Sequence, residues 1–453
     1  MRTDDSTAVI SGVGSCLPPR VVDNDAVIAR GALRTDAGWI RDRTGIERRR
    51  HASPGTSTGD LAVGAGRAAL TSAGGTRPDL VLLATSTPDH PCPATAPEVA
   101  HRLGLGTVAA FDVSAVCSGF LYALAVATGL VRGGVCTTPL VIAAETYTSI
   151  VDPSDRGTAP IFGDGAGAVL LRPGVRDEPG AVLATDLGSD GSGRAAITIP
   201  GGGARHPRHL PPPAADAHFF HMEGRAVYAH AVRRMTQSSD AVLRQAGWTP
   251  DSVRAFIGHQ ANQRILDSVG DRLGIAPAHR YGNIRELGNT AAASVPLVLA
   301  DPLVYRAVAP GERTLLTAFG GGFTWASAAL TWPDVRPLTE PPDTIPLSRT
   351  TTTPSPPVSA PVRSPQLERV YTHLVTLLGD KFEVAPDLIR PDATLGDLDL
   401  DSLAVVELYV TLQEEWGVPL DDSAATAELT VDEVARSVAG LLAANGAPRD
   451  ATP

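Results

Sequence analysis

Cysteine is scarce in this chain of 453 residues, and its four cysteines stand far apart, at Cys16, Cys92, Cys117 and Cys136. So sparse and irregular a set excludes a disulfide framework, and no Cys-x-x-Cys pair suggests a zinc site. A reducing compartment fits such cysteines best. The N-terminus lacks the basic and then apolar order of a signal peptide, and no apolar run approaches the length of a membrane span. We therefore expect a soluble, cytoplasmic protein.

An excess of basic charge is also missing. The formal net charge is −11, and residues 366–446 alone hold 16 Asp and Glu against four Lys and Arg. The rest of the chain is therefore almost neutral, which argues against a nucleic-acid binder. The acidic segment is either a module that basic patches on partner proteins recognise or an ordinary solvated surface.

Residues 1–332 alternate short apolar strands with longer helical patterns, as layered α/β domains do. Two successive series, over about 1–175 and 176–332, suggest a duplicated fold of two α/β halves. Strands are predicted at Ala8–Val13, Leu80–Ser86, Val108–Ser114, Leu140–Ala144, Ala166–Leu171, Val182–Leu187, Val253–Ile257, Arg313–Ala318 and Ala326–Thr331. Helices are predicted at Asp60–Ala73, Ala94–Leu103, Ser118–Val131, Gly224–Gln245, Gln260–Leu273 and Thr290–Val304.

The composition changes abruptly at residue 333. Residues 333–365 are rich in Pro, Thr and Ser, cannot bury a core, and are predicted to form a semi-extended linker. Residues 366–446 return to helical periodicity, which predicts a small all-α domain on a tether, and residues 447–453 form a tail. The helices of this domain are predicted at Gln366–Leu378, Ser402–Trp416 and Val431–Ala444.

Cys117 stands between a predicted buried strand and the predicted helix Ser118–Val131. Free backbone N–H groups and the positive end of the helix dipole at such a junction favour a thiolate over a thiol. The position therefore suits a nucleophile that forms a thioester, although many buried cysteines are only small hydrophobic residues. His259 and Asn289 each stand directly before a predicted helix, and each on its own could be structural.

Three motifs that contain these residues occur together: Asp112-Val-Ser-Ala-Val-Cys117-Ser-Gly, Gly258-His259-Gln-Ala-Asn and Gly288-Asn289-Thr-Ala-Ala-Ala-Ser-Val-Pro-Leu. They resemble the Cys-His-Asn triad of β-ketoacyl-acyl-carrier-protein synthase III, in the thiolase superfamily. The resemblance covers Ala8–Trp332 and implies a five-layer αβαβα fold and a homodimer. Further matching motifs begin at Asp36, Asp152, Phe162 and Phe319.

The resemblance implies a decarboxylative Claisen condensation. Cys117 would take an acyl group from an acyl-CoA, while the backbone N–H groups of Cys117 and Gly321 form the oxyanion hole. His259 and Asn289 would donate hydrogen bonds to the carbonyl oxygen of a malonyl-type thioester as it loses CO2. The carbanion would then attack the Cys117 thioester, and neither a metal nor a redox cofactor is required.

The same resemblance assigns Trp39, Arg43 and Arg156 to the nucleotide of coenzyme A, through stacking and charge pairing. Cys92 occupies a position where the family often has a large aromatic residue that caps the acyl pocket of the partner subunit. The smaller side chain leads to the hypothesis that the pocket admits a longer or branched acyl group.

The segment Leu395-Gly-Asp-Leu-Asp-Leu-Asp401-Ser402-Leu resembles the phosphopantetheine attachment motif of acyl carrier proteins. Ser402 would then carry a covalent 4′-phosphopantetheine, added by a phosphopantetheinyl transferase, whereas an ordinary Asp-Ser helix cap is the alternative. Tethering would raise the local carrier concentration to about millimolar. The fusion suggests polyketide or specialised fatty acid biosynthesis, with separate carrier proteins or polyketide synthase enzymes as possible partners. The carrier could hold the extender, the acyl donor or the product.

Two other functions fit the same residues. A relative of the synthase could transfer an acyl group to oxygen, nitrogen or sulfur without forming a carbon–carbon bond. Such a transfer needs no donor pair for an enolate, so the presence of His259 and Asn289 favours condensation. Alternatively, an inert synthase domain could serve as a scaffold for the carrier.

Overall fold

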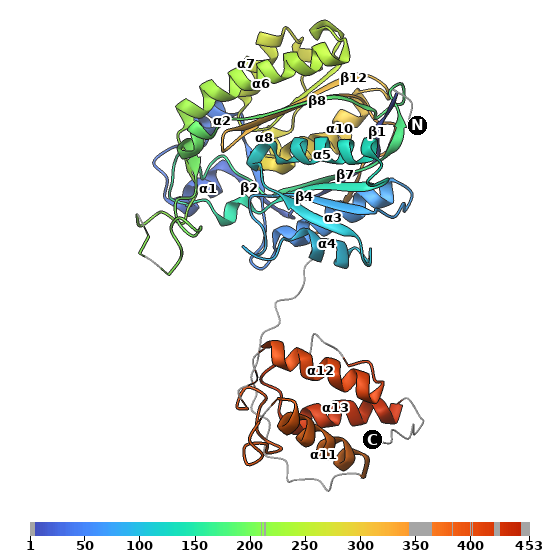
Figure 1. The fold of residues 1–453 in the computed structure, drawn as a ribbon. Coiled ribbons are helices and arrows are strands. Elements are labelled where there is room, and N and C mark those ends of the chain that lie inside the picture. Colours follow the sequence, from blue (N-terminus) through green and yellow to red (C-terminus); the bar gives the residue numbers. More distant parts are fainter. Residues whose placement is uncertain are drawn as a thin grey trace. The chain divides into compact units, whose positions relative to one another are not determined.

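The computed structural model describes residues 5–209, 211–212, 214–343, 365–382, 384–398, 400, 402–420 and 426–444. The chain divides into two compact units, Met1–Arg349 and Thr350–Pro453 (Figure 1). The boundary falls within the segment predicted as a linker, and residues 344–364 of that segment lie outside the described residues.

The first sheet of the larger unit has six strands in the order β14-β1-β7-β6-β4-β5. β4 runs parallel to both of its neighbours, whereas β7 is antiparallel to β6 and β1. β4 and β6 are buried at every residue, since helices cover both faces of the sheet. The strands span Ser6–Cys16 (β1), Leu80–Ala84 (β4), Ala109–Val113 (β5), Pro139–Glu145 (β6), Gly165–Val175 (β7) and Leu338–Glu340 (β14).

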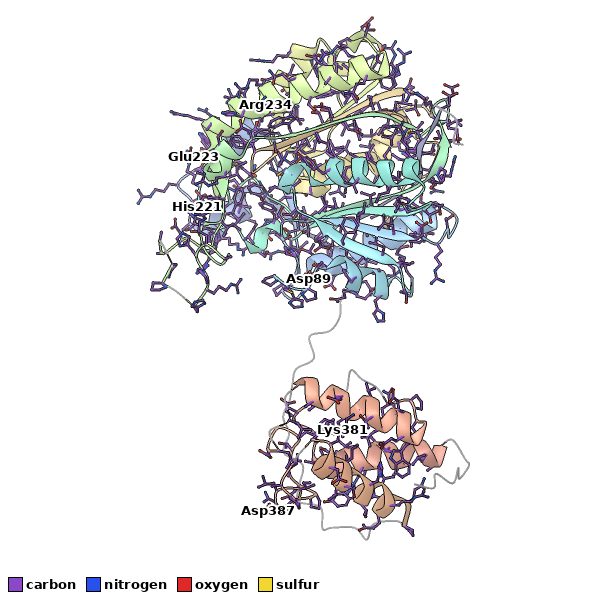
Figure 2. The ribbon with its side chains drawn as sticks, viewed as in Figure 1. Asp89, His221, Glu223, Arg234, Lys381 and Asp387 are labelled. Carbon is purple, nitrogen blue, oxygen red and sulfur yellow. The ribbon has the colours of Figure 1, made fainter. Side chains whose placement is uncertain are left out.

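The second sheet has four strands in the order β11-β12-β13-β8. The long helix α6 (Gly224–Ala246) covers its outer face together with α7 (Gln263–Leu273). Arg234 of α6, labelled in Figure 2, pairs with Asp190 and lies over the ring of Trp325, which ties the helix to this sheet. The strands span Val182–Ser189 (β8), Ala255–Gly258 (β11), Arg313–Gly320 (β12) and Thr324–Thr331 (β13).

Helix α5 (Gly119–Gly133) lies between the two sheets and contacts β4 and β6 of the first and β12 and β13 of the second (Figure 1). Alternate residues of β4 separate the two faces: Leu82 packs in the cluster with α5, and Leu83 packs in the cluster with α3 (Thr58–Ser72) and α4 (Ala96–Arg102). The resulting five layers, αβαβα, confirm the predicted thiolase-like fold.

Two parts of the first sheet differ from the sequence prediction. The strand before Cys117 was expected to be buried, but β5 is the edge strand of the sheet, and Phe111 is 41% exposed. Residues 333–343 were assigned to the linker, yet β14 pairs in parallel with β1 and belongs to the folded unit. The edge position of β5 and the pairing of β14 both depend on which strands lie side by side, and the order of strands along the chain does not show this.

Several short elements also differ. The helix predicted over Thr290–Val304 is instead divided into η6 (Ala291–Ala293), α9 (Ser294–Leu299) and α10 (Pro302–Ala307). Asp301 caps α10 and proline stands at its first position, so a new helix begins there. The sequence analysis missed β2 (Arg20–Asp23), α1 (Asn24–Gly31), α2 (Ala37–Thr44), β3 (Arg48–His51), β9 (Ile197–Thr198) and β10 (His221–Met222).

The described residues of the smaller unit form three packed helices, as predicted. They are α11 (Pro365–Asp380), α12 (Ser402–Trp416) and α13 (Val431–Ala444). Their apolar residues form one buried core, and Lys381 pairs with Glu407 across the surface. The predicted tail, residues 447–453, lies outside the described residues.

Among the described residues, one helical stretch, Val116–Gly133, is long and apolar enough to cross a membrane. It comprises α5 and the turn before it, and 56% of it is buried within the structure. Its position between two sheets accounts for its apolar character.

Candidate active site

Cys117 lies in a tight turn, η1 (Val116–Ser118), between β5 and α5. Val116 has a φ of 46°, in the left-handed region, so the chain turns sharply just before the cysteine. The Ser118 hydroxyl lies 2.8 Å from both the Ala115 carbonyl and the Thr324 hydroxyl, and these contacts hold the turn against β13. The turn thus places Cys117 at the predicted junction, with only 8% of its surface exposed.

The end of β12 approaches this turn very closely. A Cβ atom on Gly320 would lie 2.8 Å from the Cys117 backbone nitrogen and 3.1 Å from that of Ser118. A Cβ atom on the next residue, Gly321, would lie 2.9 Å from the Ile197 side chain and in ordinary contact, at 3.5 Å, with the Val116 side chain. The backbone at residues 320–321 therefore lies against the Cys117 turn, which an oxyanion hole shared by Cys117 and Gly321 requires.

Substituting Gly320→Ala should displace the Cys117 turn. We expect a loss of about 1–3 kcal/mol in the free energy of unfolding, because the methyl group has no room. We also expect a slower acylation of Cys117, measured by intact-protein mass over time. Gly129→Ala on α5 is the matched control, since nothing lies within 4 Å of its Cβ position, and it should leave both quantities unchanged or slightly stabilise the helix. Equal behaviour of the two variants would contradict the close approach.

His259 follows β11 and is 2% exposed. Burial lowers the pKa of its imidazole to about 3, so the ring is neutral near pH 7. Its Nδ1 lies 2.7 Å from the Ser294 hydroxyl, which also accepts a hydrogen bond from the Gln260 backbone N–H at 3.3 Å. While it accepts from Gln260, that hydroxyl can also donate its own hydrogen to Nδ1. In that tautomer the imidazole proton is on Nε2, which makes Nε2 a hydrogen-bond donor.

Asn289 is 5% exposed and stands beside Phe162 through a parallel β-bridge. Its backbone N–H donates to the Ile161 carbonyl at 2.9 Å, and its carbonyl accepts from the Gly163 N–H at 3.0 Å. The side-chain oxygen accepts from the Ala291 N–H at 2.9 Å. With the oxygen engaged in this way, the side-chain amide nitrogen is the group left to donate to a ligand.

The three predicted catalytic residues belong to segments that contact one another. The η1 turn of Cys117 contacts both η6, which follows Asn289, and β12. β12 pairs with β11, whose end carries His259, and Ser294 beside η6 contacts the imidazole. The fold therefore gathers all three residues around one buried region.

The electrostatic prediction for Cys117 was wrong. The pKa of the thiol is raised, chiefly by burial and then by the charge of Glu145, and a backbone hydrogen bond offsets only part of this. The helix terminus therefore does not prevail over desolvation. Since His259 is also neutral, the resting site holds a thiol and an uncharged imidazole.

Three buried aromatic residues form a wall in the cluster that contains Cys117. Tyr147 stacks on Phe162 with ring centroids 4.4 Å apart, and Phe220 lies edge-on to both at 5.2 and 5.1 Å. The sequence analysis missed this aromatic wall, because its members come from three separate loops. An acyl group on Cys117 would meet an apolar surface here.

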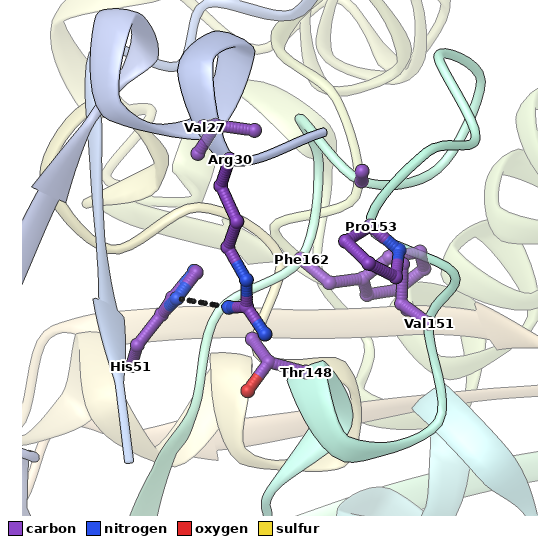
Figure 3. Close-up of a pocket in the computed structure, with 8 residues that line it drawn as sticks. Val27, Arg30, His51, Thr148, Val151, Pro153 and Phe162 are labelled. Carbon is purple, nitrogen blue, oxygen red and sulfur yellow. Dashed lines mark hydrogen bonds between the residues drawn. The ribbon is translucent and has the colours of Figure 1, made fainter. Parts of the chain in front are cut away.

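Phe162 also lines a cavity with about 360 Å³ of empty space, including the part open to solvent (Figure 3). Arg30 and His51 line it, with Arg30 Nη1 3.5 Å from His51 Nδ1. The cavity shares Phe162 and Val151 with the cluster around Cys117 but does not include the thiol. It is therefore distinct from the site of the predicted chemistry.

The three residues predicted to hold coenzyme A lie together. The Arg156 guanidinium carbon is 4.3 Å from the centroid of the Trp39 ring, and that of Arg43 is 5.9 Å away. Trp39 is 37% exposed. Because Arg156 already covers one face of the indole, a base that stacks on that face must displace the guanidinium.

Family models match both units of the chain. The model for 3-oxoacyl-[acyl-carrier-protein] synthase III matches residues 111–191, that for its C-terminal part matches residues 243–332, and that for a phosphopantetheine attachment site matches residues 372–438. β-Ketoacyl-[acyl-carrier-protein] synthase III 2 of Streptomyces coelicolor is 56% identical over 331 residues, which cover 73% of this chain and 96% of the relative. The chain belongs to the ketosynthase III family.

Solved structures of ketosynthase III proteins agree. 3-Oxoacyl-(acyl carrier protein) synthase III of Pseudomonas aeruginosa has a TM-score of 0.67 at 44% identity, over 73% of this chain and all of that one. The priming β-ketosynthase of the R1128 polyketide pathway has a TM-score of 0.68 at 34% identity, over 74% of this chain and 99% of that one. The predicted family and fold are thus confirmed. The family model for a phosphopantetheine attachment site matches residues 372–438, which follow the ketosynthase III region in the chain.

The roles of all the predicted site residues stay predictions, and Cys92 and Ser402 are not placed in the site described above. Cys92 is exposed, and a role beside a partner subunit is untested. Ser402 is the first residue of α12, but its side chain lies outside the described residues, as does the whole of Asp401.

Proposed function

We propose that this ketosynthase III condenses an acyl-CoA with a malonyl-type thioester on an acyl carrier protein. The observation that carries the proposal is the convergence of Cys117 with two neutral donors, His259 and Asn289, in one buried region. As an enzyme it is then an acyltransferase that forms a carbon–carbon bond. A transfer to oxygen, nitrogen or sulfur would not use the donor pair.

In the first step the Cys117 sulfur attacks the acyl carbonyl. A C–S bond forms, the bond to the coenzyme A sulfur breaks, and the thiol proton leaves with coenzyme A. The raised pKa of the Cys117 thiol means that this proton must be removed during the attack, not before it. Backbone N–H groups of Cys117 and Gly321 stabilise the oxyanion, as the close approach of β12 supports.

In the second step a malonyl thioester replaces coenzyme A. His259 Nε2 and the Asn289 amide nitrogen donate to its carbonyl oxygen, while the carboxylate leaves as CO2 and its electron pair forms an enolate. The enolate carbon attacks the acyl carbonyl, the bond to the Cys117 sulfur breaks, and the sulfur takes up a proton from solvent to regenerate the thiol. Burial keeps both donors away from water, which strengthens the hydrogen bonds.

The smaller unit supplies a carrier. A phosphopantetheine on Ser402 would attach at the first residue of α12, where a phosphate is favoured by the helix dipole. A phosphopantetheinyl transferase would add the group. The likeness to a priming ketosynthase of a polyketide pathway supports polyketide or specialised fatty acid synthesis, with further carriers or synthases as partners.

We also propose that the enzyme is a cytoplasmic homodimer. β5 is an edge strand that exposes Phe111, and apolar edges tend to be covered by a second chain. Cys92 would then lie near the partner's acyl pocket. All four cysteines are free, which supports a reducing compartment.

Intact-protein mass spectrometry tests the proposed condensation. The phosphopantetheinylated protein is incubated with acyl-CoAs and malonyl-CoA, and a β-ketoacyl mass on the carrier is the expected product. Ser402→Ala should lose that mass but still acylate Cys117 and extend a separate malonyl carrier. Acyl-Cys117 that never consumes malonyl groups, even on a separate carrier, would instead favour simple acyl transfer.

A further inference from the structure

Glu145, the last residue of β6, is fully buried, and the mechanism above leaves it unused. β6 contacts η6, and η6 in turn contacts the turn of Cys117. The Ser86 backbone N–H donates to its two carboxylate oxygens at 3.1 and 3.0 Å. The Thr87 hydroxyl donates to one of them at 2.9 Å. Both partners belong to the loop after β4, so the carboxylate holds that loop to the end of β6.

The same carboxylate also reaches the loop that carries Asn289. It accepts a backbone hydrogen bond from Ala292, within η6 and three residues beyond Asn289. Ala291, beside it, has a φ of 45° and is held in this strained conformation by the Asn289 side chain. One buried carboxylate thus connects two loops and a strand around the active site.

The negative charge of Glu145 also acts on its neighbours. It raises the pKa of the Cys117 thiol and that of the Tyr147 hydroxyl, in both cases in addition to burial. Burial raises the pKa of Glu145 itself to about 7, against hydrogen bonds that lower it. A group with this pKa is close to half-protonated at neutral pH, so its hydrogen bonds distinguish it more than its charge does. Donors from two separate loops converge on one buried carboxyl group, which calls for an explanation beyond packing.

We propose that Glu145 is a positioning residue of the condensation, whose carboxyl group holds the loop of Asn289 in place through the hydrogen bond from Ala292. This inference rests on the proposed function. The loop after β4 anchors the same carboxyl group, so a side chain that is shorter, or that lacks one acceptor oxygen, releases one of the two loops.

Glu145→Gln and Glu145→Asp test the positioning role. Glutamine keeps the length of the side chain but loses one acceptor oxygen, and aspartate keeps both oxygens but is one methylene shorter. In the folded variants, the decarboxylation of a malonyl carrier should slow about tenfold more than the acylation of Cys117, since Asn289 acts only in decarboxylation.

Asp164→Asn is the matched control. Asp164 is also a buried carboxylate, and it accepts hydrogen bonds from Ala52 and Thr148. This variant should slow both steps equally or not at all, even if it lowers the melting temperature.

Equal slowing of both steps in the Glu145 variants, or the same selective slowing in Asp164→Asn, would overturn the inference. A parent that acylates but never condenses would instead contradict the proposed function. A parent that condenses, with variants that slow both steps equally, would contradict only the positioning role of Glu145.

Discussion

Condensation should disappear when Cys117 is replaced by alanine, with kcat lower by a factor of about 10³ or more. The substitution removes the thiol from the buried region where the segments of His259 and Asn289 meet, so Cys117 can no longer form a thioester there. Intact mass after incubation with an acyl-CoA should show an acylated parent and an unmodified variant. The fold should survive, since cysteine to alanine leaves a small cavity beside the aromatic wall.

Cys136→Ala is the control for Cys117→Ala. Cys136 is also a buried, free cysteine, but it packs in the main core instead of the cluster around the active site. We expect this variant to acylate and condense like the parent. A Cys117→Ala protein that still carries an acyl group, or condenses at more than a small fraction of the parent rate, would show that another residue is the nucleophile.

The location of Cys117 could be predicted from sequence because it depends on local patterns. An apolar strand, a cysteine and an amphipathic helix follow one another directly, and the structure places the turn η1 between them. The charge state of the thiol could not be predicted in this way. It depends on burial and on Glu145, which comes from β6, and the sequence does not show which strands meet around the cysteine.

Dependence on contacts between distant segments also explains the errors in the predicted fold. β14 joins the first sheet through pairing with β1, more than 300 residues earlier in the chain, so composition alone assigned it to the linker. The helices α1 and α2 are only eight residues long, and each is stabilised by an aspartate cap that a periodicity search does not weigh. The long helices α5 and α6 were predicted nearly correctly, because their apolar faces repeat over several turns.

The aromatic wall and the donor geometry also depend on tertiary contacts. Phe220 reaches Tyr147 and Phe162 from a loop more than 50 residues away. The motif around His259 identifies the residue, but only the fold brings the Ser294 hydroxyl to Nδ1 and to the Gln260 N–H. Sequence thus indicates the candidate side chains, while the structure shows which groups surround them.

Replacing His259 or Asn289 by alanine should separate the two half-reactions. Each substitution removes one donor to the malonyl thioester oxygen, and we expect decarboxylation to fall about 10²-fold to 10³-fold. Acylation of Cys117 should change by less than about tenfold, because the oxyanion hole of that step consists of backbone groups. Acylation is measured by intact mass, and decarboxylation by release of CO2 from a malonyl carrier.

Ser294→Ala provides a graded companion to these substitutions. It removes the hydroxyl that faces His259 Nδ1 but leaves the imidazole in place, so the proton is no longer directed to Nε2. We expect a decarboxylation rate between those of the parent and His259→Ala, with acylation unaffected. If His259→Ala instead slowed acylation as strongly as decarboxylation, the imidazole would have to take the thiol proton of Cys117. Because the pKa of that thiol is raised, its proton needs a base during acylation. The ratio of the acylation and decarboxylation rates therefore shows whether His259 acts as that base or as a hydrogen-bond donor to the malonyl thioester.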